Sequence, residues 1–586
     1  KAFVDDAAVD PLARRTYLYE RWLDKWTTVE GQVVERRHTT PMTPADPESK
    51  WSDEQYLEAW DDYGDSANWT GHAAIAATFR YAVTGADADY ARMLKFVNAD
   101  LLDFEATGMD GYLARFNMAA VPPGTKIRNG YAMVERAFDD TGRFDIPANK
   151  LSLFPAYYTQ GIPTADGTTT TPSRPSWDGH VSIDAYSGPW NSFPLAYPLV
   201  KDPVVKEAMA RHFTCSLKRL RIARVINLSQ NTTLRDEIGA YLTSGTYTPD
   251  ADEPDLTKLD EVWAFYLPQY NVNSAATYPR DCPATMATEP ELTIDVTQPG
   301  YEGKLLLFFL RQGDGDKSDG IDFGFYPSAR AGDAVMLDDY ALAAYQMTYD
   351  PQYLTWRDQV LFGKAKAKDV ERTVGAFHIP KACSDYFRLQ NVYTAHLARL
   401  LTDNDPESRA FAQYIWSKKY EAKEESTLRD SMFEILYAGT TGQSSARLTD
   451  ALAEIASLGG TKDALETPRR NYDLDNEADP PPGITVSAPS QADVDLCTAG
   501  VTLLGIHIPG STPDPAARYA DPALPVMRRP TQCFMWEKDP FSAKRVRGAG
   551  ESGRQMYEGL DLSMPYWFGR YFGLIADPHV VLAWGP

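Results

Sequence analysis

Six aspartates recur in one local setting, each at or just before the start of a segment predicted to be a buried helix. Any one of them is explained by capping, because aspartate is a favoured helix N-cap and its charge interacts well with the helix dipole. As a set they are more specific, since the helices of a closed ring would gather all six carboxylates at one mouth of a central cavity. Paired carboxylates are the groups that cleave glycosidic bonds. The six are Asp65, Asp184, Asp339, Asp385, Asp495 and Asp561.

Four of these aspartates lie in segments rich in side chains that bind sugars. Asp65 and Asp184 form the best catalytic pair, followed by Asp385 and Asp561. Aromatic rings suit both sugar-binding clefts and cores, so packing around helix caps is the alternative interpretation. The predicted substrate-binding residues are Trp69, His72, Arg115, His180, Tyr186, Trp190, Tyr386, Arg388, Tyr566, Trp567 and Arg570.

A polysaccharide lyase would use the same region differently. A histidine such as His72, His180 or His378 would take the proton beside a uronate, and Arg115 or Arg388 would stabilise the enolate. The acidic net charge of the chain disfavours a polyanionic substrate, so we rank a lyase below a hydrolase.

The segments that carry these residues are predicted to be helices of two chemical kinds. Amphipathic segments with regularly spaced charges have a solvent-facing side; they are 86–105, 202–228 and 405–422. Nearly uncharged segments rich in small and aromatic residues are predicted to be buried on all sides; they are 68–85, 185–200, 339–349, 389–401, 495–508 and 562–575. Buried and solvent-facing segments follow each other in pairs, which predicts a ring of inner and outer helices.

One stretch departs from the helical pattern. Residues 291–298 alternate apolar and polar side chains, and 301–312 form a short apolar run after a Pro-Gly turn, which together predict a β-hairpin. We therefore expect a single helical domain over 1–586 with a β-rich insertion at about 286–330. Long loops at 160–178, 248–256 and 479–530 are predicted to be cavity rims or disordered flaps.

This layout resembles the (α/α)6 toroid of many glycoside hydrolases and polysaccharide lyases. The resemblance covers about residues 50–575 and rests on the alternating helices, on the acids and aromatic residues at the inner N-termini, and on stretches such as WTGHAAIAATFRYAVTG. It implies a carbohydrate-active enzyme that uses paired carboxylates in a central aromatic cavity. Toroids of this kind also serve epimerases and cyclases, so the fold alone does not supply the reaction.

Charge and composition exclude other classes of partner. The chain has 58 Lys and Arg against 81 Asp and Glu, a net charge of −23, which repels nucleic acid. It has no stretch of about 18 apolar residues, the length that crosses a bilayer. The sequence begins at Lys1 without an initiator methionine, from which we expect a secreted or periplasmic bacterial protein whose signal has been removed.

The sequence predicts no required cofactor, but structural calcium is open. An acidic loop approaches an EF-hand in its spacing, without the central glycine or the closing glutamate; its candidate ligands are Asp314, Asp316, Asp319 and Asp322. The five cysteines form no C-x-x-C pair, which argues against zinc or haem. Cys215 and Cys497 are predicted to be buried thiols, while one or two disulfides remain open.

A different class of function fits the same sequence. A secreted protein without catalytic activity could use the cavity to bind a glycan, or use its outer helices to assemble with copies of itself. A measurement of glycan turnover distinguishes a carbohydrate-active enzyme from a protein that only binds or assembles.

Overall fold

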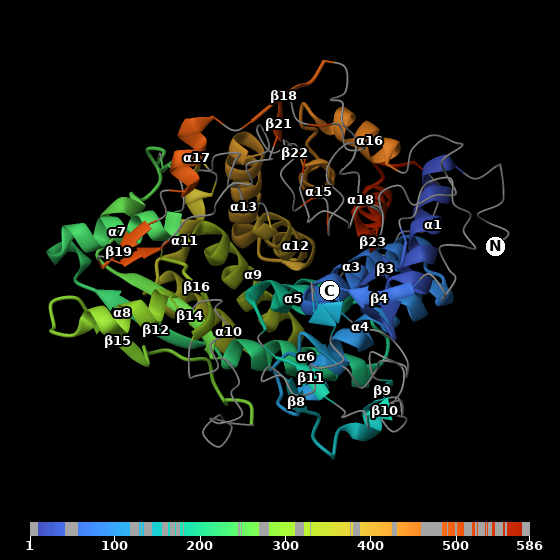
Figure 1. The fold of residues 1–586 in the computed structure, drawn as a ribbon, viewed down its shortest axis with the longest axis horizontal. Coiled ribbons are helices and arrows are strands. Elements are labelled where there is room, and N and C mark those ends of the chain that lie inside the picture. Colours follow the sequence, from blue (N-terminus) through green and yellow to red (C-terminus); the bar gives the residue numbers. More distant parts are fainter. Residues whose placement is uncertain are drawn as a thin grey trace.

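The computed structural model of the chain is mainly helical, with several small sheets (Figure 1). Apart from short internal gaps, it describes residues 10–40, 57–117, 143–154, 176–268, 281–310, 321–458, 483–508 and 559–576, together with short segments at 128–133, 162–171, 518–524, 534–536, 542–544 and 555–556.

Six helices form the buried centre of this described part (Figure 1). They carry few charges and many small or aromatic side chains, so most of their described side chains are buried. They are α3 (Ser66–Thr84), α5 (Ile183–Ala196), α9 (Ala331–Thr348), α12 (Phe387–Thr402), α15 (Ser431–Thr441) and α18 (Leu560–Tyr571). Five of them correspond to predicted buried segments, whereas α15 is not among the predictions.

The contacts among the six helices form a circuit. Helix α3 packs against α18, α18 against α15, α15 against α12, α12 against α9, α9 against α5, and α5 against α3; α12 also packs directly against α5. The order of contacts therefore returns to α3, the helix at which it starts.

A more exposed helix packs on each buried one. Five of these outer helices follow their buried partner directly in the chain, and the sixth, α1, packs against α18. Asp202 caps α6 and Asp405 caps α13, each followed by a proline in the first turn, as the sequence predicts. The outer helices are α1 (Pro11–Trp26), α4 (Asp87–Thr107), α6 (Pro203–Lys218), α10 (Gln352–Trp356), α13 (Pro406–Tyr414) and α16 (Leu448–Ser457). Helices α10 and α13 continue as π-helices over Arg357–Phe362 and Ile415–Glu424, and α11 (Ala367–Val370) follows the first.

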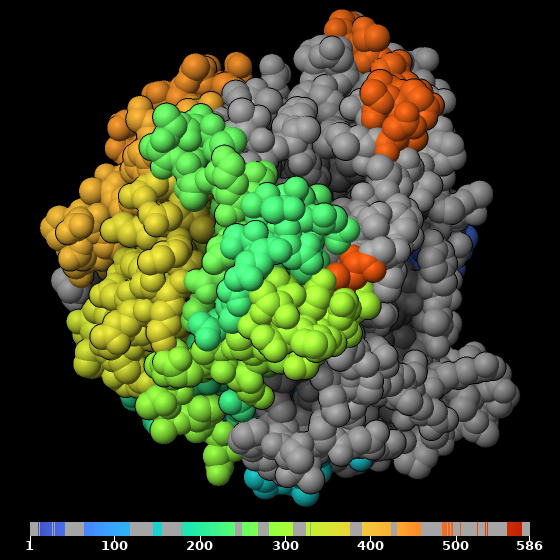
Figure 2. All heavy atoms as spheres, turned by 90° about the vertical axis from the view of Figure 1, so that its left-hand side faces the viewer, coloured from blue at the N-terminus to red at the C-terminus, as the bar shows by residue number. Residues whose placement is uncertain are grey.

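A four-stranded sheet has its own small core. Its strand order is β15 (Leu292–Asp295), β12 (Arg221–Ile226), β14 (Val262–Pro268) and β16 (Ile321–Phe325). Apolar residues of the sheet pack with α7 (Thr232–Thr243) and α8 (Tyr301–Leu310). Figure 2 shows this unit, mostly in green shades, on the outer face of the molecule beside the yellow segments that follow α9.

The structure corrects three predicted elements. The run at 301–312 is helix α8 for most of its length, and β15 pairs in parallel with β12, so the predicted hairpin is wrong. Segment 202–228 does not form one helix, because α6 ends at Lys218 and β12 begins at Arg221. Segment 495–508 is not a buried helix: α17 (Gln491–Thr498) is followed by the antiparallel strands β19 (Val501–Leu503) and β20 (Ile506–Ile508).

Two three-stranded sheets border the N-terminal ends of α3 and α5. One joins β5 (Phe116–Asn117), β11 (Ser176–Asp178) and β8 (Arg143–Asp145), and the other joins β23 (Gln555–Met556), β3 (Glu35–His38) and β4 (Leu57–Asp61). Among the helices that the structure describes, none has the length and apolar character needed to cross a membrane.

Candidate active site

Arg115 lies between the first turn of α3 and strand β11. Its backbone carbonyl accepts a hydrogen bond from the N–H of Ala67 (3.2 Å), and its own N–H donates to the carbonyl of Asp178 (2.9 Å). These two bonds fix the main chain of Arg115 at the N-terminal end of α3, so the direction of its side chain is set by ordered elements on both sides.

Asp65 pairs with Arg115 and does not cap its helix. Nη2 of Arg115 lies 3.0 Å from Oδ1 of Asp65, and Nε donates to the carbonyl of Gly64. Asp65 stands at the N-cap position of α3, yet its side chain makes no capping hydrogen bond. The side chains of Arg115 and Asp65 are 23% and 29% exposed, so a ligand can reach this ion pair from solvent.

Asp184, on the neighbouring helix, interacts with the same guanidinium through its charge. It is the second residue of α5, whose N-cap is Ser182, so Asp184 is not a cap either. Burial lowers the pKa of Arg115, but the negative charges of Asp65, Asp184 and Asp178 outweigh burial and raise this pKa above its usual range. Two predicted catalytic aspartates and one predicted binding arginine therefore form a single cluster.

Close packing of α3 on α5 brings the two aspartates together. A Cβ added to Gly188 of α5 would lie 2.3 Å from the carbonyl oxygen of Ala67 in α3. Asp184 precedes Gly188 by one helical turn, and Asp65 lies just before Ala67. The small residues of these buried helices thus permit the backbone contact that places both carboxylates beside Arg115.

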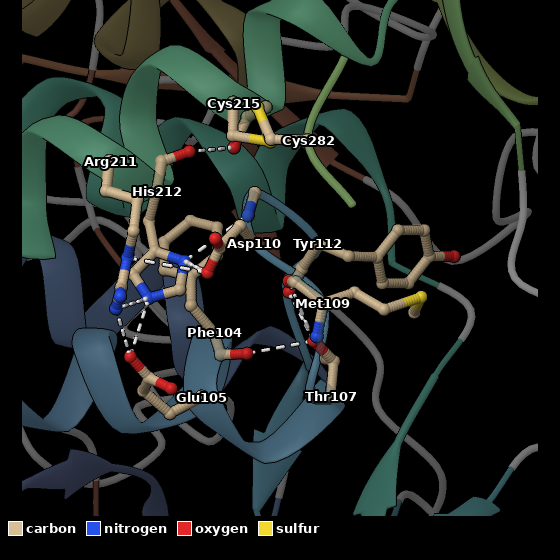
Figure 3. A network of polar contacts seen from close by, with 12 residues as sticks. Phe104, Glu105, Thr107, Met109, Asp110, Tyr112, Arg211, His212, Cys215 and Cys282 are labelled. Atoms are coloured by element: carbon tan, nitrogen blue, oxygen red, sulfur yellow. Dashed lines mark hydrogen bonds and ion pairs between the residues drawn. A yellow bond between two sulfur atoms is a disulfide. The ribbon is translucent and has the colours of Figure 1, made fainter. Parts of the chain in front are cut away.

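A polar network between α4 and α6 holds the segment that ends at Arg115 (Figure 3). Glu105 accepts hydrogen bonds from Nη2 of Arg211 (2.5 Å), from Nε2 of His212 (3.0 Å) and from Lys150. Burial raises the pKa of Glu105, but the hydrogen bonds from His212 and Lys150 outweigh burial and lower this pKa to about 2. The N–H of Gly111 donates to Nδ1 of His212, which requires the neutral ring that burial favours by lowering the pKa of His212.

The disulfide Cys215–Cys282 lies against the same segment (Figure 3). It corrects the prediction that Cys215 is a free buried thiol. A Cβ on Gly111 would lie 2.5 Å from the carbonyl carbon of Cys215, so the segment before Arg115 packs directly on the disulfide-bonded turn of α6. The sequence gives no signal for this pairing, because the two cysteines are 67 residues apart.

Three predicted aromatic binders are buried in the core. Tyr186 and Trp190 have no exposed surface, and Trp69 is 2% exposed. The hydroxyl of Tyr186 accepts a hydrogen bond from the N–H of Leu113 (2.9 Å), and Trp190 stacks on Phe325. These rings support the elements around Arg115 and do not offer a face to a ligand.

His72 connects α3 to α12 in the interior. It has no exposed surface, and burial lowers its pKa, so its ring is neutral. Nδ1 lies 2.8 Å from the carbonyl oxygen of Asn68, and Nε2 lies 2.5 Å from Oε1 of Gln390. Both ring nitrogens are therefore engaged in a buried contact between helices, which gives His72 no access to a substrate proton.

The candidates on α18 do not meet at Arg115. Asp561 lies in the first turn of α18 and is 4% exposed. Further along the helix, Nε1 of Trp567 donates to Glu20 of α1 (2.8 Å), and Nη1 of Arg570 donates to the hydroxyl of Tyr566 (2.6 Å). These last three side chains belong to the interface between α18 and α1.

Two of the six aspartates do not share the predicted mouth. Helix α9 begins at Ala331, so Asp339 lies in its middle, where it contacts His396 (3.1 Å) and Arg399 (3.2 Å) of α12. Asp495 lies inside the short helix α17 and is exposed. The prediction that six carboxylates head six inner helices is therefore wrong for these two.

Several predicted residues lie outside the described part of the chain. They are His180, Asp385 and Tyr386, together with the calcium candidates Asp314, Asp316 and Asp319; for Arg388 and Asp322 only the backbone is described.

One described acidic group has a spacing suited to a metal ion. Asp250, Asp252 and Glu253, in the predicted long loop at 248–256, place carboxylate oxygens within 4.8 Å of one another. Nζ of Lys419 lies 2.5 Å from Glu253, 3.7 Å from Asp252 and 3.8 Å from Asp250. An ammonium group of the chain itself thus supplies positive charge among these carboxylates.

The structure defines a mainly helical protein with an Asp-Arg-Asp cluster where two buried helices begin. No known protein family, curated protein or solved structure matches the chain. Its function is therefore argued from the cluster itself.

Proposed function

We propose that the chain is a glycoside hydrolase in which Asp65 and Asp184 act on a glycosidic bond and Arg115 holds the substrate between them. One observation carries this proposal: both aspartates interact with a partly exposed arginine and neither caps its helix. The separation of two such carboxyl groups sets whether the product keeps or inverts the anomeric configuration.

We infer different roles for the two carboxyl groups. The hydrogen bond from Arg115 stabilises negative charge on Asp65, which suits a nucleophile or a base that activates water. Asp184 interacts with Arg115 through charge, and we assign it by elimination as the acid that protonates the departing sugar oxygen.

The circuit of six buried helices, each covered by an outer helix, supports an (α/α)6 toroid. In such a toroid the Arg115 cluster would lie at the mouth where inner helices begin. The disulfide Cys215–Cys282 supports export to an oxidising compartment, where a glycan-degrading enzyme would meet its substrate. A lyase is less well supported, because its candidate base His72 is buried.

The test compares Asp65→Asn and Asp184→Asn with the wild type on a broad panel of polysaccharides and aryl glycosides. We expect each change to lower the rate by about 10²–10⁴-fold while the circular dichroism spectrum and melting temperature stay close to those of the wild type. Asp450→Asn, an exposed position in α16, is the matched control. Wild-type turnover that survives both site changes would refute the assignment, and absence of turnover in the wild type would favour a non-catalytic binder.

A further inference from the structure

A pocket of about 970 Å³ opens at the other end of the buried helices. Its walls come from the end of α9 (Tyr345, Tyr349), the end of α12 (Thr402, Asp403), the residue after α5 (Tyr197) and the first turns of the outer helices. Asp184 lies in the first turn of α5 and Tyr197 follows its last residue, so with a rise of about 1.5 Å per residue the pocket lies roughly 20 Å from the Arg115 cluster. It is a separate site.

Tyr349 is unusual in this pocket. It ends α9 in the left-handed conformation (φ 55°), and its side chain is 73% exposed. Glycine occupies the corresponding left-handed position after α3, α4 and α15, at Gly85, Gly108 and Gly442. A tyrosine at such a position is conformationally less favourable than glycine and also exposes a large apolar ring to solvent, which is a suitable arrangement for a binding surface.

The aromatic ring of Tyr349 belongs to a platform. Its centroid lies 6.0 Å from that of Tyr345, with the rings nearly perpendicular (77°). The exposed ring of Tyr349, with the ring of Tyr345 nearly perpendicular to it, offers an apolar surface to the pocket. The C–H face of a sugar ring is a suitable partner for such a surface.

The remaining lining favours a neutral ligand with many hydroxyl groups. Four described lining side chains are basic and four are acidic, so the pocket has no excess charge that would select an ion. Oδ2 of Asp403 and Nε of Arg399 are buried and 3.8 Å apart, and neither has a hydrogen-bond partner within the described residues. A hydroxyl between them could accept from Nε–H and donate to Oδ2, given a small movement of the pocket wall.

We propose that this pocket is a second saccharide-binding site, in which a sugar ring stacks on Tyr349 and its hydroxyls bind to polar groups around Asp403. The site needs no catalysis at Arg115. It would hold a polysaccharide chain on the outside of the protein while another part of the chain, or another chain, is processed.

Tyr349→Gly tests the proposal, because glycine fits the left-handed position and should preserve or raise the melting temperature. Binding is measured by calorimetry with the neutral hexasaccharides of cellulose, xylan, chitin and starch. The protein used is the Asp65→Asn, Asp184→Asn double variant, which does not consume the probe. We expect at least one probe to bind, and Tyr349→Gly to weaken that binding roughly tenfold or more.

Leu153→Ala, which alters an exposed apolar residue outside the pocket, should leave binding unchanged. Equal affinity with and without Tyr349 would overturn the proposal, and so would failure of all four probes to bind. Turnover by the wild type is measured separately, so loss of the Arg115 assignment and loss of this site are distinct outcomes.

Discussion

Gly71 of α3 and Gly188 of α5 lie backbone against backbone, so closely that a Cβ on Gly71 would come within 2.2 Å of the carbonyl carbon of Gly188. Such a contact leaves no room for a side chain on either residue. Because Asp65 and Asp184 lie within about one or two turns of this contact, their relative position depends on it.

Gly71→Ala should therefore impair both stability and the site. The added methyl group meets main-chain atoms that cannot rotate away, so the helices must separate, at a cost of about 3 kcal/mol in the free energy of unfolding. Urea unfolding measures this loss. Gly303→Ala is the control, because Gly303 is exposed in α8 with open space around it, and this change should be neutral or stabilising by about 0.5–1 kcal/mol. A wild-type unfolding midpoint for Gly71→Ala would show that α3 and α5 are not held at this distance.

Arg399 should be essential to the interior between α9 and α12. Its Nη1 lies 2.5 Å from Asp338 and 3.2 Å from Asp339, and all three side chains are almost completely buried. Arg399→Met removes the cation shared by two buried carboxylates and leaves Arg357 as the cation paired with Asp338, so we expect a loss of about 3–5 kcal/mol at neutral pH. Arg235→Met, which removes a pair with the exposed Asp236, should cost about 1 kcal/mol or less. Similar losses for the two variants in urea unfolding would contradict this account.

The helical class and most helix pairs are predictable because buried and solvent-facing helices differ in amino-acid composition. Helices α3, α5, α9, α12 and α18 carry few charges, whereas α4, α6 and α13, which follow α3, α5 and α12, carry a larger share of them. Composition does not distinguish helix from strand where an element is short or where a segment is apolar without periodicity. Strand β12 continues the apolar pattern of α6, and only its pairing with β14 and β15 determines that Arg221–Ile226 is extended.

The candidate site was only half predictable for a similar reason. In the sequence, Asp65 and Asp202 look alike, because each is an aspartate that precedes a predicted helix. Asp202 accepts a hydrogen bond from the backbone N–H of Val204 and is a cap, whereas Asp65 binds Arg115, 50 residues away in the chain. Local sequence contains no information on that partner, so a cap cannot be distinguished from an ion-paired carboxylate without the fold.

The disulfide should stabilise the scaffold that carries Arg115. Cys215 and Cys282 close a loop with a sequence separation of 67, and loops of this size give disulfides worth about 2–4 kcal/mol. We expect the Cys215→Ala, Cys282→Ala double variant to unfold at lower urea concentration by a corresponding amount. Dithiothreitol should shift the wild type to the same midpoint and leave the double variant unchanged. A further shift of the double variant on reduction would assign the effect to other cysteines.

Asp100 and Asp103 of α4 should make stability fall as the pH rises. Both side chains are fully buried. Burial raises the pKa of Asp103 to about 8, an effect only partly offset by hydrogen bonds from Asn117. Burial and the neighbouring charge of Asp103 raise the pKa of Asp100 well above its usual range.

The sign of this pH dependence follows from the number of protons bound by the folded and unfolded states. Between the ordinary aspartate pKa near 4 and a pKa of about 8, the folded protein keeps a proton on Asp103 that the unfolded chain has lost. The contribution of Asp103 to stability is therefore fully present below about pH 4 and decreases by up to about 1.4 kcal/mol per pH unit until about pH 8. Above that pH it is constant, because both states are then ionised.

Asp103→Asn tests this directly, because the amide oxygen can still accept the bond from Asn117 while nothing remains to ionise. Urea unfolding of the variant at pH 5 and pH 8 should give a smaller loss of stability with rising pH than the wild type shows. The exposed Asp450→Asn changes the net charge equally and should keep the wild-type slope. If Asp103→Asn and Asp450→Asn have the same pH dependence, the general repulsion of an acidic chain, and not the buried carboxyl group, controls the alkaline loss of stability.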